Sequence, residues 1–251
     1  MIRFFRNYRQ FSIREGKIGN YLTYAIGEII LVVIGILIAL QFNTFHENHI
    51  NKKAEHYYLS QMKIDLISDS LIINQELANF EKKLPLIQGF LTEIQKENNK
   101  ESFNEAFRNY INNILVPLSF VSNRSTYSEM ESSGQLVIIR DRELRNRIVT
   151  LYNNLEKTEN AYQVNYEFMQ PIDALLIYEK GIAKYQKYQS ALFSSYISED
   201  ELYDLKSMKA DLENNAANWN WTIVDMQPAV TAQLDELRDV IARINAYLEK
   251  D

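Results

Sequence analysis

The residue whose chemistry is most out of place is a glutamate within an apolar run. Glu28 lies in YLTYAIGEIILVVIGILIALQFNTF, residues 21–45, among mostly aliphatic neighbours. If this run crosses a bilayer, an ionised carboxylate at that depth costs at least about 2.5 kcal/mol. Three interpretations stay open: a neutral or hydrogen-bonded glutamate that joins helices, a side chain that reaches toward the headgroups, and a carboxylate that handles protons or ions.

Small residues beside Glu28 predict close helix packing. Gly35 and Ala39 are four residues apart, and Gly27 lies on nearly the same face of a helix. Small residues at this spacing let the backbones of two helices approach each other in lipid. We therefore expect self-association or association with a partner through Gly27, Gly35 and Ala39. The alternative is a lone anchor in which these residues have no packing role.

The other reactive side chains do not form a recognisable catalytic or metal site. The histidines, His46, His49 and His56, fall within eleven residues, and a water-exposed helix face is the preferred interpretation over a metal site. Ser132 and Ser133 have no histidine near them in sequence. No phosphate-binding glycine motif occurs, and the chain has no cysteine. We expect no enzyme activity, no metal and no cofactor.

Several aromatic residues in the last third of the chain could line a ligand groove. Tyrosine occurs 16 times, and the candidates for a glycan or peptide groove are Tyr178, Tyr185, Tyr188, Tyr196, Tyr203, Trp219 and Trp221. Several of them also fall on apolar helix stripes. Packing in a core or an interface is therefore favoured over a groove.

The run that holds Glu28 is predicted to be an uncleaved membrane anchor. The stretch from Leu22 to Gln41 is about 20 residues, enough to cross about 30 Å of hydrocarbon. It is longer than the apolar part of a signal peptide, and Ala39-Leu40-Gln41 lacks a small-x-small cleavage pattern. Five basic residues precede the run: Arg3, Arg6, Arg9, Arg14 and Lys17.

That charge distribution predicts the topology. By the positive-inside rule, the basic N-terminus is cytoplasmic and the remainder lies across the inner membrane, in the periplasm. We expect a basic tail over residues 1–20, a transmembrane helix over 21–45 and a periplasmic domain over 46–251. The net charge is −6, so the body is acidic and repels phosphates, which argues against a nucleic-acid partner.

Two stretches resemble a known family. YAIGEIILVVIGILIALQFN, preceded by MIRFFRNYRQ, and TYSEMESSGQLVIIRDRELRNRIVTLYNNLE, residues 126–156, resemble an uncharacterised family of single-pass inner-membrane proteins from Bacteroidota. The resemblance covers roughly a fifth of the chain by its motifs. It implies a membrane location and supplies no activity.

The rest of the chain predicts an all-α fold. Glycine (7) and proline (4) are too scarce for the turns of a barrel or sandwich. Apolar residues recur at helical spacing, most clearly at Val230, Leu234, Leu237, Ile241, Ile244 and Leu248. These stripes predict that the transmembrane helix continues into a bundle of about four long helices.

Several residues mark the expected ends of helices. The first helix is predicted to run from the anchor to about Leu84, with a kink allowed at Pro85 and Gly89. Further expected boundaries are Pro117, a C-cap at Gly134, N-caps at Asp141 and Ser198, a break at Pro171 and an end near Leu192.

Two functions fit this pattern. The first is a membrane-tethered periplasmic interaction module that acts as a scaffold, sensor or assembly protein. The alternative is a subunit of an ion-conducting or proton-driven complex that uses Glu28, a layout that resembles the single-pass subunits of proton-driven stators. Expected partners are the lipid bilayer, further copies of the chain, and another membrane or periplasmic protein.

Overall fold

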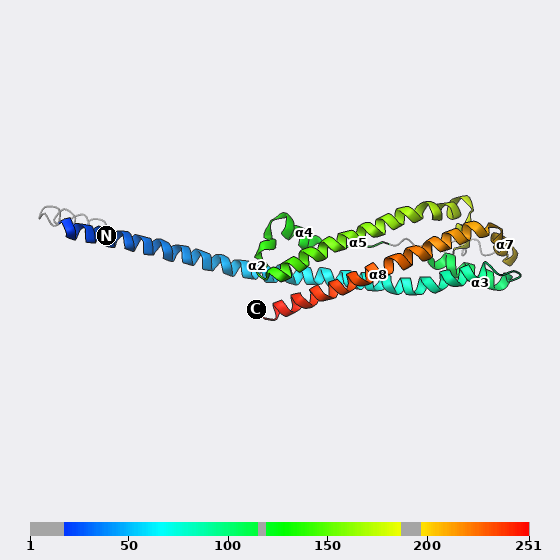
Figure 1. The fold of residues 1–251 in the computed structure, drawn as a ribbon, viewed down its shortest axis with the longest axis horizontal. Coiled ribbons are helices and arrows are strands. Elements are labelled where there is room, and N and C mark those ends of the chain that lie inside the picture. Colours follow the sequence, from blue (N-terminus) through cyan, green and yellow to red (C-terminus); the bar gives the residue numbers. More distant parts are fainter. Residues whose placement is uncertain (1–17, 115–118, 187–196, 251) are drawn as a thin grey trace. The chain divides into compact units, whose positions relative to one another are not determined.

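The computed structural model describes residues 18–114, 119–186 and 197–250, and this part of the chain is helical throughout, without a strand. The principal helices are α2 (Ile18–Glu93), α3 (Lys100–Ile114), α4 (Ser125–Ser132), α5 (Arg142–Ala174), α7 (Glu199–Asp204) and α8 (Lys209–Leu248) (Figure 1). Short 3-10 or π turns, η1 (Gln135–Ile138), η2 (Leu175–Glu179), η3 (Ile182–Tyr185) and η4 (Leu205–Met208), separate some of them. The predicted all-α class is confirmed.

The chain divides into two compact units, Met1–His56 and Tyr57–Asp251. The described part of the first unit is the N-terminal portion of α2. Its aliphatic side chains are exposed, for example Ile29 at 63% and Leu31 at 74%. In the described residues, α2 is the one helix that is long and apolar enough to cross a membrane.

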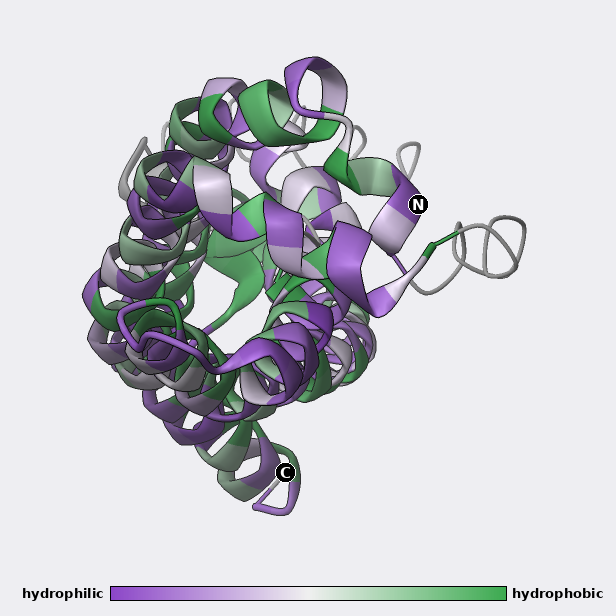
Figure 2. Cartoon of the chain, turned by 90° about the vertical axis from the view of Figure 1, so that its right-hand side faces the viewer, coloured by the Kyte–Doolittle hydropathy of each residue, from purple (hydrophilic) through white to green (hydrophobic). Residues whose placement is uncertain are grey.

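The second unit, called the body below, is built on one apolar core. Its long helices are the part of α2 that follows His56, α5 and α8, and the shorter α3 completes the bundle. In Figure 2, hydrophobic residues lie toward the interior of the bundle and hydrophilic ones lie toward its outside. Core residues that are fully buried include Leu59, Met62, Leu66, Phe80, Ile148, Leu151, Leu155, Ile223, Leu237 and Ile244.

An aromatic cluster joins α2 to α3. The ring of Phe90 stacks on Tyr110 with 4.5 Å between centroids and contacts Phe103 and Phe107 at 6.1 and 5.9 Å. All four rings are buried. Helix α3 supplies three of these rings, Phe103, Phe107 and Tyr110.

Buried carboxylates hold the segment before α4 against α2. Both oxygens of Asp69 accept the backbone N–H of Asn123, at 2.9 and 3.1 Å. Asp65 accepts from the Asn123 amide at 2.9 Å and from the Thr126 hydroxyl at 2.5 Å. These bonds place the first turn of α4, which carries no side-chain cap of its own.

Three predicted helix boundaries are confirmed by their capping geometry. Gly134 follows α4 with a φ of 69°, a left-handed conformation in which glycine has no side-chain penalty. The Asp141 carboxylate accepts the N–H groups of Glu143 and Leu144, at 2.9 and 3.0 Å, and begins α5. Ser198 begins α7 and accepts the N–H of Glu201 at 3.1 Å.

The prediction that Pro171 breaks its helix is wrong. Helix α5 continues past Pro171 to Ala174. Proline removes one N–H, but its fixed φ near −65° is already helical, so the helix tolerates it when tertiary contacts support the following turn. The ordered helix instead changes into the π turn η2, and Gly181 follows with a φ of 67°.

Helix α2 likewise continues past Pro85 and Gly89 without a break. Pro117 and Leu192 lie outside the described residues.

Candidate ligand pocket between α5 and α8

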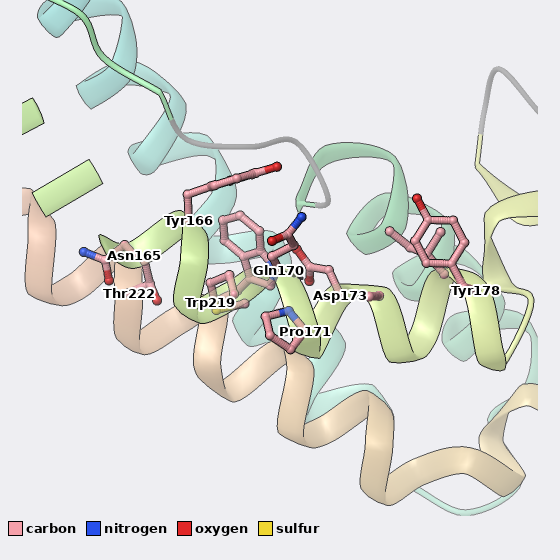
Figure 3. A pocket seen from close by; sticks show the side chains of 11 residues that line it. Asn165, Tyr166, Gln170, Pro171, Asp173, Tyr178, Trp219 and Thr222 are labelled. Carbon is pink, nitrogen blue, oxygen red and sulfur yellow. Dashed lines mark hydrogen bonds between the residues drawn. The ribbon is translucent and has the colours of Figure 1, made fainter. Parts of the chain in front are cut away.

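A pocket in the body lies between α5 and α8. It is a cavity of about 420 Å³ whose lining includes Tyr166, Asp173, Tyr178, Trp219 and Thr222. Most of these residues come from the C-terminal end of α5 and the η2 turn, and Trp219 and Thr222 come from α8 (Figure 3). Figure 3 shows Tyr178 at one end of the pocket and Thr222 at the other.

The helices that form the pocket are positioned by their apolar stripes. Helix α5 buries Tyr162, Met169 and, in the η2 turn, Leu176, while α8 buries Ile223 and Met226. The π turn widens the backbone at the end of α5, and such turns are frequent at functional sites. Tyr178 therefore lies in an irregular segment, where its side chain is 82% exposed.

Among the described residues that line the pocket, Asp173 is the one with a charged side chain. Two donors share one of its carboxylate oxygens. The amide of Asn215 and the indole N–H of Trp219 both donate to Oδ1, at 2.8 and 2.9 Å. The buried Tyr110 hydroxyl donates to Asn215, so the network reaches into α3.

Burial controls the charges at this site. It raises the pKa of Asp173, and the hydrogen bonds from Asn215 and Trp219 lower it. The ammonium of Lys83, on α2, lies 5.6 Å from the centre of the Trp219 ring. Burial lowers the pKa of Lys83. A carboxylate that loses hydration in this way binds a counter-charge or a hydrogen-bond donor more readily than a fully solvated one.

This arrangement suits a ligand with a cationic or N–H group. Aromatic faces attract cations, and Trp219, Tyr166 and Tyr178 line the same cavity as Asp173. The Thr222 hydroxyl is buried without a hydrogen-bond partner and adds a polar group to the lining. The pocket therefore combines one carboxylate, aromatic walls and a moderate volume, which are features of a ligand-binding site.

The aromatic residues singled out from the sequence separate into two groups. Tyr185 and Trp219 are buried and Tyr203 packs on the core, as favoured, whereas Tyr178 and Trp221 are exposed. Tyr178 and Trp219 both line the pocket between α5 and α8. Tyr188 and Tyr196 lie outside the described residues.

The residues predicted for the membrane segment lie in the first unit. Glu28 and Ala39 are exposed on α2. A side chain added at Gly27 or Gly35 would meet no atom within 4 Å, so both positions are open. In the described residues no group of three histidine, aspartate or glutamate side chains forms a metal site, and this holds for the stretch with His46, His49 and His56.

Sequence reasoning missed Asp173 and Asn215. They are ordinary polar residues in their own helices and are separated from each other by 42 residues. The sequence did hold one indication, the spacing of Asn215. It lies three residues after Leu212 and four before Trp219, so it falls on the same buried face of α8 as these two residues. A polar residue on an apolar stripe predicts a buried hydrogen-bond partner.

Comparison with known proteins gives one match. The model of a family described as "Family of unknown function (DUF6090)" matches residues 28–168, more than half of the chain. No curated protein and no solved structure matches the chain. The matched region begins at Glu28 and contains the first part of the pocket, including Tyr166, while α8 lies beyond it.

Proposed function

Because the chain belongs to DUF6090, a family of unknown function, we propose a function from its own architecture. The protein is a membrane-tethered module whose helical body, held at the periplasmic face of the inner membrane, binds other molecules. It acts as a scaffold, sensor or assembly protein and has no catalytic role.

The exposed apolar segment of α2 carries this proposal. From Ile26 to Leu40, the large aliphatic side chains are each about half exposed or more. Water disfavours such a surface by roughly 25 cal/mol for every Å². A bilayer removes that penalty, since an α-helix satisfies its own backbone groups in lipid. Tethering therefore explains why this stretch is apolar although no described residue of the chain covers it.

The direction of insertion follows from charge. The basic residues precede the apolar segment, and positive charge is retained on the cytoplasmic side. The body then lies in the periplasm. Its pocket, which is lined by the Asp173 carboxylate and by aromatic side chains, supports a binding role.

Replacement of two apolar residues tests the tether. Val32→Asp with Ile36→Asp places two charges near the middle of the segment, at about 3 kcal/mol each. We expect the wild-type chain to stay with membranes through alkaline carbonate extraction and the variant to be released. The matched control, Val32→Ala with Ile36→Ala, should stay. A wild-type chain found shortened and soluble would show a cleaved signal sequence and overturn the proposal.

Protease treatment tests the side of the membrane. In spheroplasts, added protease should remove the body and leave a short N-terminal fragment. Protection of the whole chain in spheroplasts, together with digestion in inverted vesicles, would reverse the topology. Purification of the full chain from native membranes, with identification of co-purifying proteins, would then name the partner.

The alternative function depends on Glu28. In a proton-driven or ion-conducting complex, Glu28 would need to titrate or to bind an ion, whereas in a tether it only packs. Glu28→Gln keeps the size and the hydrogen bonding and removes the charge. Unchanged function in this variant supports the tethered module, and loss of function with normal membrane insertion supports proton or ion handling.

A further inference from the structure

Helix α2 has a second apolar stripe within the body, on the side away from the core. Tyr57, Ile64, Ile67 and Leu71 are exposed by 61, 57, 40 and 66%. The core-facing stripe of the same helix is fully buried and consists of Leu59, Met62, Leu66, Ile73 and Phe80. One helix therefore presents apolar residues on two faces, and only one of these faces is covered by the described residues of the body.

The exposed stripe follows a heptad. Tyr57, Ile64 and Leu71 are seven residues apart, and Ile67 lies three residues after Ile64 and four before Leu71. In heptad notation these are a and d positions, and the core-facing residues occupy c and f, on the opposite side of the helix. Alternating steps of three and four are the pattern of a coiled-coil seam. The exposed stripe is thus shaped for another helix.

We propose that a second copy of this chain packs against the stripe as a parallel coiled coil. The proposal rests on the membrane tether proposed above. Two copies inserted in the same direction present α2 parallel and at the same height, because α2 is continuous from Ile18 to Glu93. Each stripe then meets its own counterpart in register. Ile64 at an a position and Ile67 at a d position suit packing in a coiled-coil seam, and this combination also accommodates more than two strands.

Charges beside the seam allow self-pairing. The flanking positions are Gln61, Lys63, Ser68 and Ser70. In a parallel dimer, Lys63 of one chain faces Ser68 of the other, so no like charges oppose each other there. The seam ends at Asn74, the next d position, where Arg238 of α8 approaches the Asn74 side-chain oxygen at 3.5 Å.

The length of the stripe explains why the membrane matters. Residues 57–71 make about two heptads, or roughly 22 Å of helix at 1.5 Å per residue. A seam of that length is short for a coiled coil in dilute solution. Two tethered copies share a surface, and this raises their effective concentration without a new contact.

Cysteine cross-linking tests the seam, because the chain has no cysteine of its own. Single replacements Tyr57→Cys, Ile64→Cys, Ile67→Cys and Leu71→Cys are oxidised in isolated membranes with copper phenanthroline. The matched control is Ile72→Cys, an exposed isoleucine of the same helix that lies outside the seam. We expect a product of twice the chain mass, several-fold more abundant at the a and d positions than at Ile72→Cys.

The opposite results overturn the proposal. Equal yields at all positions, or a maximum at Ile72→Cys, would exclude the seam, and a product of another mass would exclude a second copy as the partner. Carbonate extraction of the same membranes separates the two proposals. Chain that remains in the pellet without periodic cross-linking overturns the seam alone, whereas chain that is released overturns the tether and the parallel arrangement with it.

Discussion

At the scale of single residues, the Asp173 carboxylate joins α5 to α8. It accepts hydrogen bonds from the side-chain amide of Asn215, which is fully buried, and from the indole N–H of Trp219. The Asp173→Ala variant leaves both donors without an acceptor, a loss of about 2–3 kcal/mol in the free energy of unfolding. Urea unfolding of the full chain in detergent, followed by far-UV circular dichroism, measures it.

A matched change separates this network from a general charge effect. Asp225 is an exposed aspartate of α8, so Asp225→Ala should change the free energy of unfolding by less than about 0.5 kcal/mol. Asp173→Asn should fall between the two, since an amide oxygen still accepts a hydrogen bond. Equal losses for Asp173→Ala and Asp225→Ala would contradict a structural role for the network.

Asp69 makes the stability of the body depend on pH. Burial raises its pKa from 3.8 to about 6, against the lowering effect of the Asn123 N–H. The folded state therefore holds this proton more tightly than the unfolded state, and the contribution of Asp69 is greatest below about pH 4. As the pH rises through 6, ionisation removes up to about 3 kcal/mol of that stability.

The Asp69→Asn variant tests the sign of this effect. Asparagine keeps an acceptor for the Asn123 N–H and cannot ionise. Between pH 4 and 7, we expect the wild-type chain to lose stability relative to the variant. Subtracting the variant's stability from the wild type's at each pH leaves the effect of Asp69 alone. It removes the effect of Glu93, whose pKa is lowered to about 2 by hydrogen bonds from Lys96, Ser102 and Asn99 and which therefore stabilises the fold as the pH rises. Parallel curves would show that Asp69 does not titrate in this range.

At the scale of helices and turns, the sequence predicts most of what is local. Gly134 and Asp141 were identified because a cap depends on the few residues around it. The Ser198 cap is present as well, and the Glu201 carboxylate accepts a backbone hydrogen bond from Ser198 in return, as in a capping box. Glu201 also accepts from Lys184, at 2.5 Å, and from Tyr185, at 3.3 Å.

Features that depend on tertiary contacts were predicted less well. The effect of Pro171 depends on whether the next turn is held in place, and Asp173 holds it by bonds to α8. The pocket joins segments about 45 residues apart, and Tyr110 joins its network from 105 residues away. A single sequence states which residues are apolar, but it does not state which helix each stripe will meet.

The N-cap of α5 can be tested in isolation. Asp141→Ala removes the acceptor for the N–H groups of Glu143 and Leu144, at a cost of about 1 kcal/mol. Asp141→Ser should retain most of the stability, because serine also caps. Arg147→Ala, at an exposed position of the same helix, is the control and should be nearly neutral. Urea unfolding of the three variants and the wild type measures the effect, and equal values for Asp141→Ala and Arg147→Ala would contradict it.

At the scale of the whole molecule, one helix serves three environments. The first part of α2 is apolar around its circumference and is suited to lipid. After His56 the same helix supplies the core with one face, and its opposite face presents the exposed heptad. The body therefore needs α2 for its own stability and, on our proposals, for its attachment and its pairing. Variants in the span should consequently leave the helical content of the body unchanged.

The last prediction concerns the span itself. In the single chain, a side chain at Gly35 meets no atom within 4 Å, so Gly35→Ile creates no clash within the molecule. If Gly35 and Ala39 form the packing face between two copies, isoleucine separates the helices and weakens the dimer. We expect Gly35→Ile to reduce chemical cross-linking in intact membranes, with an unchanged circular dichroism spectrum.

Val33→Ile supplies the control, because it adds bulk to the span on a different face. It should leave cross-linking at the wild-type level. Combining Gly35→Ile with Leu71→Cys separates the contact in the span from the heptad seam. The disulfide yield at Leu71→Cys should fall when Gly35→Ile is added. In that background it should still exceed the yield at Ile72→Cys, because the heptad preserves its register. A wild-type chain that remains monomeric in membranes, or a Gly35→Ile chain that associates as the wild type does, would show that the span is an anchor only.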